Sequence, residues 1–233
     1  MNAVRRLLAG LGLALLGMAG AGNRLDVERV VFSPDGTRAL VVEAGSLDGS
    51  GFGAARLWVL STTTGAVLRR AQAQADSPDP APVVARLLRQ EAGVLRLHAL
   101  NPARVARPVY ARTFPVMAPV WTEGVEAGTA LIRPVRLWSV PVPVSLSVRP
   151  VGSSCRWGEM LPTGEGPAGF TLTVRDQVIH SDRTLPPGRE CAARYALDRA
   201  YVQGNRAVFI VRAYTPGFEG PNADVVPVAA RLR

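Results

Sequence analysis

The stretch VVFSPDGTRALVVEAGSLDGSGFGAARLWVLSTTTGAVLRR, residues 30–70, is the part of the sequence that indicates the fold class. Its short apolar runs, at residues 30–32, 39–42 and 57–60, are separated by a Ser-Pro-Asp-Gly turn and a glycine-rich loop, and a Thr-Thr-Thr-Gly turn follows. Strands bounded by such turns predict a four-stranded unit like one blade of a β-propeller. A propeller needs at least four blades and this pattern occurs once, so the unit must pack against the rest of the chain.

Length and composition point to a β-rich globular protein. The chain has 233 residues, of which 48% are apolar, enough for a buried core in one large β domain or two small ones. Glycine (23 residues) and proline (19 residues) are frequent, which suits many short strands better than long helices. We therefore predict a mainly β protein whose antiparallel or mixed sheets form a two-layer sandwich or a distorted barrel.

The first 21 residues have the pattern of an export signal. Arg5 and Arg6 precede an apolar run at residues 7–18, and small residues follow at 19–21. A membrane-spanning helix needs about 20 apolar residues, more than this run provides. We expect residues 1–21 to be a cleaved signal peptide, with a retained N-terminal anchor as the alternative, and no transmembrane helix in the mature chain. The protein is accordingly expected to be secreted or periplasmic.

Cys155 and Cys191 are the two cysteines of the chain. In an oxidising compartment they are expected to form a disulfide, with two buried free thiols as the alternative. The bridge would close a loop of about 37 residues and stabilise the fold by roughly 4 kcal/mol. Two cysteines so far apart, with no histidine pair nearby, do not make a zinc site, and we expect neither a metal nor a cofactor.

The chain is basic, with a formal net charge of +9 at pH 7, and all 27 of its cationic residues are arginines. Outside the cytoplasm this charge favours anionic lipids, cell-wall polymers or nucleic acids as partners. Nucleic-acid binding usually needs clustered cations, whereas these arginines are scattered, so we do not expect a nucleic-acid partner. A general compositional bias towards arginine is the simpler explanation of the charge.

Composition divides the mature chain into three parts. Residues 22–75 contain the blade-like unit, and the proline-rich residues 76–82 form a linker. Residues 83–233 are β-rich and are expected to pack with residues 22–75 as one domain. Apolar residues at helical spacing between positions 83 and 92 predict the one short helix of the mature chain.

Proline interrupts the apolar stretch at residues 135–148, at Pro141 and Pro143. Proline has no N–H group to donate to a strand ladder. These two residues are therefore expected on an edge strand or at a bulge, where they also hinder the addition of a foreign strand.

Two β-hairpins are predicted in the last third of the chain. A two-residue turn at 176–177 would pair Thr173 with His180 on the solvent face of the first hairpin. The dipeptide at 204–205 is a good turn for the second hairpin. Residues 207–211 are apolar throughout, which predicts a central strand buried on both faces.

Four local motifs occur in order along the chain. They are Phe32-Ser33-Pro34-Asp35-Gly36, Asp48-Gly49-Ser50-Gly51-Phe52, Leu185-Pro186 with Arg189 and Cys191 before Tyr195, and Thr215-Pro216-Gly217-Phe218-Glu219-Gly220-Pro221. With the leader, they resemble an uncharacterised family of predicted secreted bacterial proteins, over roughly residues 30–65 and 168–230. The resemblance implies export, an unassigned activity and no established catalytic residues. Residues 53–55, a glycine and two alanines, depart from the polar residues that it leads us to expect there.

Two glycine-bounded loops form the candidate binding site. One carries Asp48, Ser50 and Phe52, and the other carries Phe218 and Glu219. Binding residues concentrate on loops displayed by a rigid sheet, and the glycines beside both phenylalanines suggest that the two loops meet. The alternatives are a plain glycine turn for the first loop and a turn that seals the sheet end, with Phe218 in the core, for the second. The first loop has too few carboxylates for a calcium site.

His180 and Asp182 are the candidate acid–base pair. They lie two apart on a predicted strand, so their side chains point the same way. With Glu219 they would be the working groups of a hydrolase. A solvated histidine on a strand is the simpler alternative.

These observations favour an exported envelope protein that is not an enzyme and that binds a ligand or partner through the two loops. The alternatives are a hydrolase that uses His180, Asp182 or Glu219, and an electrostatic binder of anionic envelope polymers. The partner would be an envelope protein or such a polymer.

Overall fold

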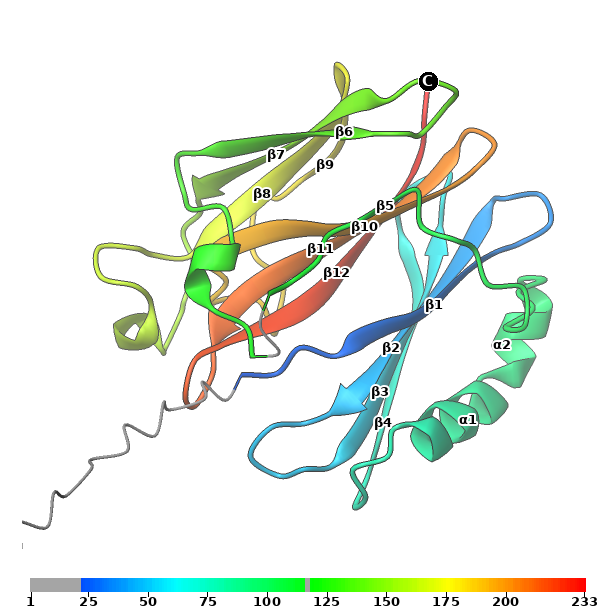
Figure 1. Cartoon of the computed structure of the whole chain (residues 1–233), viewed down its shortest axis with the longest axis horizontal. Helices are drawn as coiled ribbons and strands as arrows, with labels where there is room; N and C mark the ends of the chain where they lie inside the picture. The colour runs from blue at the N-terminus through cyan, green and yellow to red at the C-terminus, as the bar shows by residue number, and fades with distance from the viewer. Residues whose placement is uncertain (1–21, 116–117) are drawn as a thin grey trace, which may run out of the picture.

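The computed structural model describes residues 22–115 and 118–233 (Figure 1). The predicted signal peptide, residues 1–21, lies outside the described residues. Within the described part, the strands form three antiparallel four-stranded sheets, which we call sheets A, B and C. The mainly β, sandwich-like fold class is thereby confirmed, with no closed barrel among the described strands.

Sheet A is the predicted blade-like unit. Its strands, paired as neighbours in chain order, are β1 (Asp26–Phe32), β2 (Arg38–Ser46), β3 (Gly53–Ser61) and β4 (Val67–Ala75). Gly36 and Gly65 adopt φ values of 69° and 76° in the tight turns after β1 and β3, a conformation that favours glycine. The turns within residues 30–70 therefore join neighbouring strands in chain order, as expected for the predicted four-stranded unit.

Two helices cover the outer face of sheet A. They are α1 (Ala81–Gln90) and α2 (Ala92–Leu97), so the one predicted helix is followed by a second, shorter one. Val83, Val84 and Leu87 are buried in a cluster with apolar side chains of β2 and β3. Burial of such a side chain stabilises by about 1.5–3 kcal/mol, so packing on the sheet stabilises a helix that is too short to be stable alone.

Sheet B supplies the centre of the molecule. Its strands, in spatial order, are β12 (Pro221–Arg231), β11 (Arg206–Pro216), β10 (Arg194–Gln203) and the short β5 (Tyr110–Ala111). The turn at residues 204–205 joins β10 to β11, as predicted. Residues 207–211 are completely buried, which confirms the prediction of a central strand there.

Sheet C forms the other outer layer. Its strands, paired in chain order, are β6 (Ala130–Val135), β7 (Val142–Pro150), β8 (Ala168–Val174) and β9 (Gln177–Ser181). Two short 3₁₀ turns, η1 (Trp121–Glu123) and η2 (Gly158–Met160), lie in the connections before β6 and before β8.

The three sheets stack with sheet B in the middle (Figure 1). On β11, Val208 and Ile210 belong to a core shared with sheet A, whereas Phe209 and Val211 belong to a core shared with sheet C. Successive side chains of a strand point to opposite faces, so a strand that is apolar at every position can fill both cores. The stack therefore has one sheet more than the predicted two-layer sandwich.

The predicted register of the first C-terminal hairpin is wrong. The turn lies at residues 175–176, and His180 pairs with Leu172, not with Thr173. A register irregularity between Leu172 and Thr173 shifts the strands by one position. A one-residue shift moves a side chain to the other face, so His180 lies beside the core instead of on the solvent face.

The prediction for Pro143 is also wrong, whereas Pro141 lies just before β7. Pro143 lies on β7, which is paired on both sides, and its partner across β6 is Pro134. Neither residue has an N–H group, so they form a pair without hydrogen bonds between them. The carbonyl of Pro143 accepts from the N–H of Arg175 at 2.9 Å, so its ring nitrogen also faces the β8 side, just ahead of the first β7–β8 pair at Val144. An internal strand can therefore hold proline here.

Candidate functional site

Asn23 connects the two candidate loops. Its side-chain oxygen accepts a hydrogen bond of 2.6 Å from the amide of Asp48, and its amide nitrogen Nδ2 donates one of 3.0 Å to Oδ1 of Asn222. The backbone of Asn23 pairs with Ala223, whose N–H donates to its carbonyl at 2.8 Å. The β2–β3 loop and the base of the β11–β12 loop are thus fastened to one residue. No motif in the sequence singles out Asn23.

The β2–β3 loop, residues 47–52, is a closed glycine turn. Oδ1 of Asp48 accepts a hydrogen bond from the N–H of Gly49 at 2.9 Å, and the hydroxyl of Ser50 accepts one from Phe52 at 3.2 Å. Asp48 and Ser50 are exposed, and Phe52 is half-buried. Both oxygens serve the turn itself, as the plain-turn alternative expects. No group of three possible metal ligands occurs among the described residues.

The β11–β12 loop is a tight hairpin that displays Phe218. Pro216 pairs with Pro221 across its base, and Nδ2 of Asn222 donates to the carbonyl of Pro216 at 3.1 Å. A side chain at Gly217 would meet the carbonyl oxygen of Gly220 at 2.5 Å, so only glycine fits there. Phe218 is 93% exposed, and its placement in the core, the alternative for this loop, is therefore wrong. Glu219 is also exposed.

The predicted disulfide is present beside this hairpin. Cys155 and Cys191 are bonded, with their Cα atoms 4.8 Å apart. Cys191 borders a cavity of about 380 Å³, lined by Ser154, Arg156, Trp157, Gly188, Glu190, Cys191, Thr215 and Pro216. Trp157 is 50% exposed and lies under the guanidinium of Arg156, which is 5.6 Å from the ring centre. The cavity thus joins the disulfide segment to the base of the β11–β12 loop.

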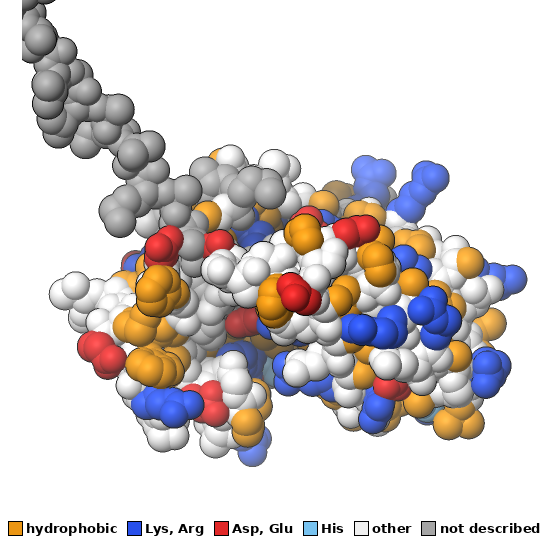
Figure 2. Space-filling view, turned by 90° about the horizontal axis from the view of Figure 1, so that it is seen from below, with side chains coloured by type: hydrophobic (Ala, Val, Ile, Leu, Met, Phe, Trp, Pro, Cys, Tyr) orange, Lys and Arg blue, Asp and Glu red, His pale blue; other side chains and the backbone are white. Residues whose placement is uncertain are grey.

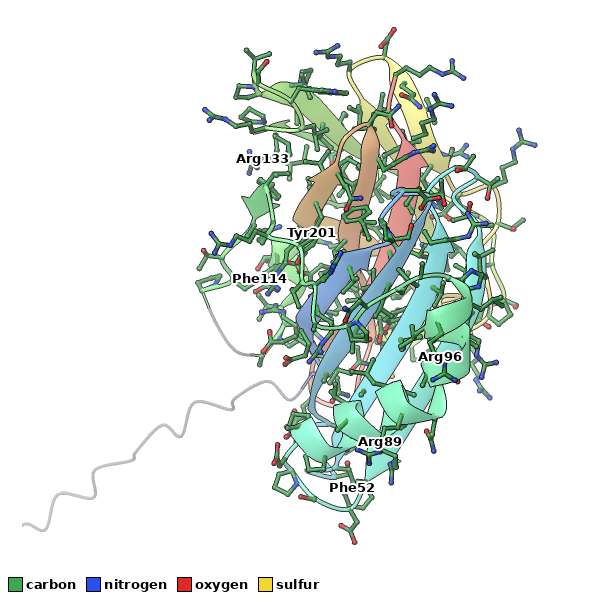
Figure 3. All side chains as sticks on the ribbon, turned by 90° about the vertical axis from the view of Figure 1, so that its right-hand side faces the viewer. Phe52, Arg89, Arg96, Phe114, Arg133 and Tyr201 are labelled. Atoms are coloured by element: carbon green, nitrogen blue, oxygen red, sulfur yellow. A yellow bond between two sulfur atoms is a disulfide. The ribbon has the colours of Figure 1, made fainter. Side chains whose placement is uncertain are left out.

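We call the end of the molecule that these features form the loop end. It consists of the β2–β3 loop, the β11–β12 loop, Asn23, and the disulfide with its cavity. In the view of Figure 1, the β2–β3 and β11–β12 loops both lie at the lower edge of the molecule. The loop end therefore presents a rigid, partly aromatic surface. In Figure 3, Phe52 lies at the lower tip of sheet A.

His180 and Asp182 do contact each other, and Arg189 is the third member of the group. Oδ1 of Asp182 accepts hydrogen bonds from Nε2 of His180, at 3.0 Å, and from the guanidinium of Arg189, while Oδ2 accepts one of 3.0 Å from the N–H of Phe170. Burial acts to raise the pKa of Asp182, but the hydrogen bond from His180 and the charge of Arg189 outweigh it and lower that pKa. Asp182 is therefore held as a buried carboxylate.

The surroundings of this group are aromatic. The His180 ring stacks on Phe170 with ring centres 4.5 Å apart, and the guanidinium of Arg189 lies 5.4 Å from Phe170 and 5.7 Å from Tyr195. The hydroxyl of Ser181 is hydrogen-bonded to Thr171 at 2.9 Å. Adjacent strand residues point to opposite faces, so Ser181 lies away from the His180 ring. The group thus connects β8 and β9 to the segment that contains Arg189 and Cys191.

A second buried group of charges lies between sheets A and B, and sequence reasoning missed it. Arg56 donates to Oε1 of Glu43 at 3.0 Å and to Oδ1 of Asp224 at 2.8 Å, and Arg212 donates to Asp198 at 2.7 Å. Burial raises the pKa of Glu43 to about 7, against the opposing charges of Arg56 and Arg212. Oε2 of Glu43 is buried with no hydrogen-bond partner among the described residues.

No helix among the described residues is long and apolar enough to cross a membrane. A family model described as a predicted secreted protein family, DUF2259, matches residues 41–231. Among curated proteins and among solved structures, none matches this chain. The matched residues include three of the four motifs that indicated the resemblance, both loops and the disulfide. The chain belongs to the DUF2259 family of predicted secreted proteins.

Proposed function

We propose that this secreted protein is not an enzyme and that it binds a partner protein of the cell envelope through the loop end. The observation that carries the proposal is Phe218, which is 93% exposed at the tip of a rigid hairpin beside a cavity. A large aromatic side chain so exposed contributes nothing to the core. Aromatic side chains with polar surroundings are enriched where proteins bind one another.

The energy of such a contact is considerable. Burying a phenylalanine side chain stabilises an interface by about 1.5–3 kcal/mol. Trp157, at the rim of the cavity, offers a second half-exposed ring. Two aromatic anchors are enough to form the centre of an interface, with Arg156 and Glu190 as its polar rim.

The rigidity of the loop end favours binding. Pro216 and Pro221 close the β11–β12 hairpin, and Asn222 fastens it. A loop already held in one conformation loses less entropy when a partner binds. In this proposal Phe218, Glu219 and Phe52 contact the partner, whereas Asp48 and Ser50 shape the loop beside them.

A structural role accounts for His180 and Asp182 better than hydrolysis does. Each oxygen of Asp182 already accepts a hydrogen bond, and Arg189 neutralises its charge. Glu219 lies on the β11–β12 loop, and no contact joins it to this group. The loop end therefore supports binding more directly than it supports catalysis.

Site-specific crosslinking in cells tests the proposal. A photoreactive residue replaces Phe218 in one variant and Ile132 in the other, since Ile132 is 61% exposed on β6 of sheet C. The expected result is a discrete adduct with one envelope protein from position 218 and none from position 132. Equal adducts from both positions, or none from position 218, would contradict the proposal.

A further inference from the structure

The helical layer on sheet A has no exposed acidic residue between positions 80 and 115; the exposed Asp79 lies just before α1, where it accepts a hydrogen bond from the N–H of Ala81. From residue 80 to residue 115 the sequence contains six arginines, and Glu91 is its only acidic residue. Glu91 is 6% exposed, and Arg69 of β4 donates two hydrogen bonds to it, at 2.6 and 2.9 Å. The one acidic group of this layer is therefore buried and neutralised.

Three exposed arginines lie on the helices. Arg86 and Arg89 lie on α1 and Arg96 lies on α2, and all three are exposed. Figure 3 shows Arg89 and Arg96 on the side of the helices that faces away from the sheets. Arg86 also donates to the carbonyl of Gln74 at 2.7 Å, which holds its side chain along β4. The inward side of α1 is apolar, so the cations gather on the outward side.

Figure 2 shows how charged side chains are distributed on one face of the molecule. Blue side chains are more numerous toward the right of this view, the side on which Figure 1 shows the helices, whereas red ones occur on both sides. Arginines are exposed on sheets B and C as well, so the helices differ from the rest of the surface mainly in having no exposed acidic residue between positions 80 and 115. A surface with cations on one side is drawn to an anionic surface in that orientation.

An exposed apolar residue accompanies these arginines. Leu97, the last residue of α2 and the neighbour of Arg96, is 80% exposed. We call the surface formed by Arg86, Arg89, Arg96 and Leu97 the basic face. A soluble polyanion offers nothing to a leucine, whereas the interface of a lipid bilayer takes up both the cations and the apolar side chain.

We infer that the basic face is a docking surface for a bilayer that contains anionic lipids. The loop end then remains free for the proposed partner, because the two surfaces use different residues. This inference is independent of the proposed function, and either can fail without the other. Each arginine near an anionic bilayer strengthens binding about fivefold at low salt.

Vesicle co-sedimentation of the mature chain tests the inference. The vesicles contain phosphatidylcholine alone or with phosphatidylglycerol, and binding is measured at low and high salt. We expect binding that requires phosphatidylglycerol and that weakens steeply with salt. The triple variant R86Q/R89Q/R96Q is expected to bind on the order of 100-fold more weakly, from three arginines at about fivefold each.

A control variant tests whether binding depends on the position of the arginines or only on the net charge of the protein. The variant R133Q/R136Q/R183Q removes three exposed arginines from the sheet C side and has the same net charge as the first variant. It is expected to bind within about twofold of the parent chain, and circular dichroism checks that both variants are folded. Equal losses in the two variants would overturn the inference, as would binding that does not depend on phosphatidylglycerol.

Leu97 distinguishes a bilayer from a soluble polymer. The variant L97S is expected to bind the anionic vesicles about tenfold more weakly, since burial of a leucine accounts for at least this factor. Its binding to heparin, a soluble polyanion, is expected to be unchanged. Tight heparin binding through the same arginines, with vesicle binding that L97S leaves unaffected, would show that the basic face serves a polymer instead.

Discussion

Glu43 is a carboxyl group that folding removes completely from water. It lies on β2, between sheet A and sheet B, and shares Arg56 with Asp224. A buried ion pair of this kind contributes little net stability, because the cost of desolvation offsets the attraction of the charges. Its second oxygen atom accepts no hydrogen bond among the described residues, and the guanidinium of Arg212 lies 3.9 Å from it.

We predict that Glu43 makes stability depend on pH. The pKa of its carboxyl group is raised from 4.5 to about 7, so between these values the unfolded chain loses its proton before the folded protein does. The free energy of unfolding therefore falls as the pH rises through this window, by about 3 kcal/mol at about 1.4 kcal/mol per pH unit. The variant E43Q lacks this titration and is expected to lack the fall.

Urea unfolding at about pH 5 and about pH 8 measures this difference. The exposed substitution Glu219→Gln is the control and is expected to follow the parent chain at both values. Parallel curves for the parent chain and E43Q would show that Glu43 does not titrate in this window.

Asp182 is predicted to be a structural anion. Asp182→Ala leaves the guanidinium of Arg189 buried without its partner, a change that usually destabilises a protein by about 3–5 kcal/mol. Because the pKa of Asp182 is lowered, the parent chain keeps this contribution above pH 3.8 and loses it as the pH falls further. Asp176→Ala, at the exposed turn before β9, is expected to change stability by less than about 0.5 kcal/mol. Urea midpoints at neutral pH that are alike for both variants would refute this role.

The disulfide and the β11–β12 hairpin are the elements that shape the loop end. Cys191 lies two residues after Arg189. Thr215 and Pro216, at the end of β11, line the cavity beside Cys191. The bridge thus joins the irregular segment before β8 to the one before β10. Its loss would loosen the walls of the cavity without touching the stacked cores.

We predict that the double variant C155S/C191S is less stable by about 2–4 kcal/mol. The physical reason is the freedom that the unfolded chain regains when the bridge is absent. Thermal unfolding with and without reductant checks it: reductant should lower the melting temperature of the parent chain and leave the double variant unchanged. A parent chain that is insensitive to reductant after complete reduction would contradict the estimate.

Elements with strong local patterns could be predicted from the sequence. The turns at residues 33–36 and 204–205 and the apolar run at 207–211 have the expected places in sheets A and B. The register of β8 and β9 could not be predicted, because the irregularity after Leu172 adds a residue without any change in the apolar pattern. The pairing of Pro134 on β6 with Pro143 on β7 could not be predicted, because the sequence does not show which strands are neighbours.

At the scale of the whole molecule, the stack of three sheets explains what the sequence could not show. Sheet B has two apolar faces, and each face needs a cover, which sheets A and C provide. Apolar composition alone indicates a large core but not the number of layers. The charge group of Glu43 and the bridge made by Asn23 depend on contacts between distant segments, so no local motif predicts them.

The stack also gives the two proposed surfaces their separate places. The loop end lies where strands of sheets A and B turn, and the basic face lies on the helices that cover sheet A (Figure 1). A secreted protein built in this way could rest on an anionic bilayer through its helices and hold a partner with its loops. Of these two contacts, the one at Phe218 is central to the account.

The most direct test is the affinity of the purified chain for the protein that crosslinks at position 218, compared for the variants F218A and I132A by calorimetry. We predict that F218A weakens binding at least tenfold, which corresponds to about 1.4 kcal/mol, while I132A leaves it within about twofold. Equal affinities of F218A and the parent chain, with both folded, would contradict the claim that the loop end binds the partner.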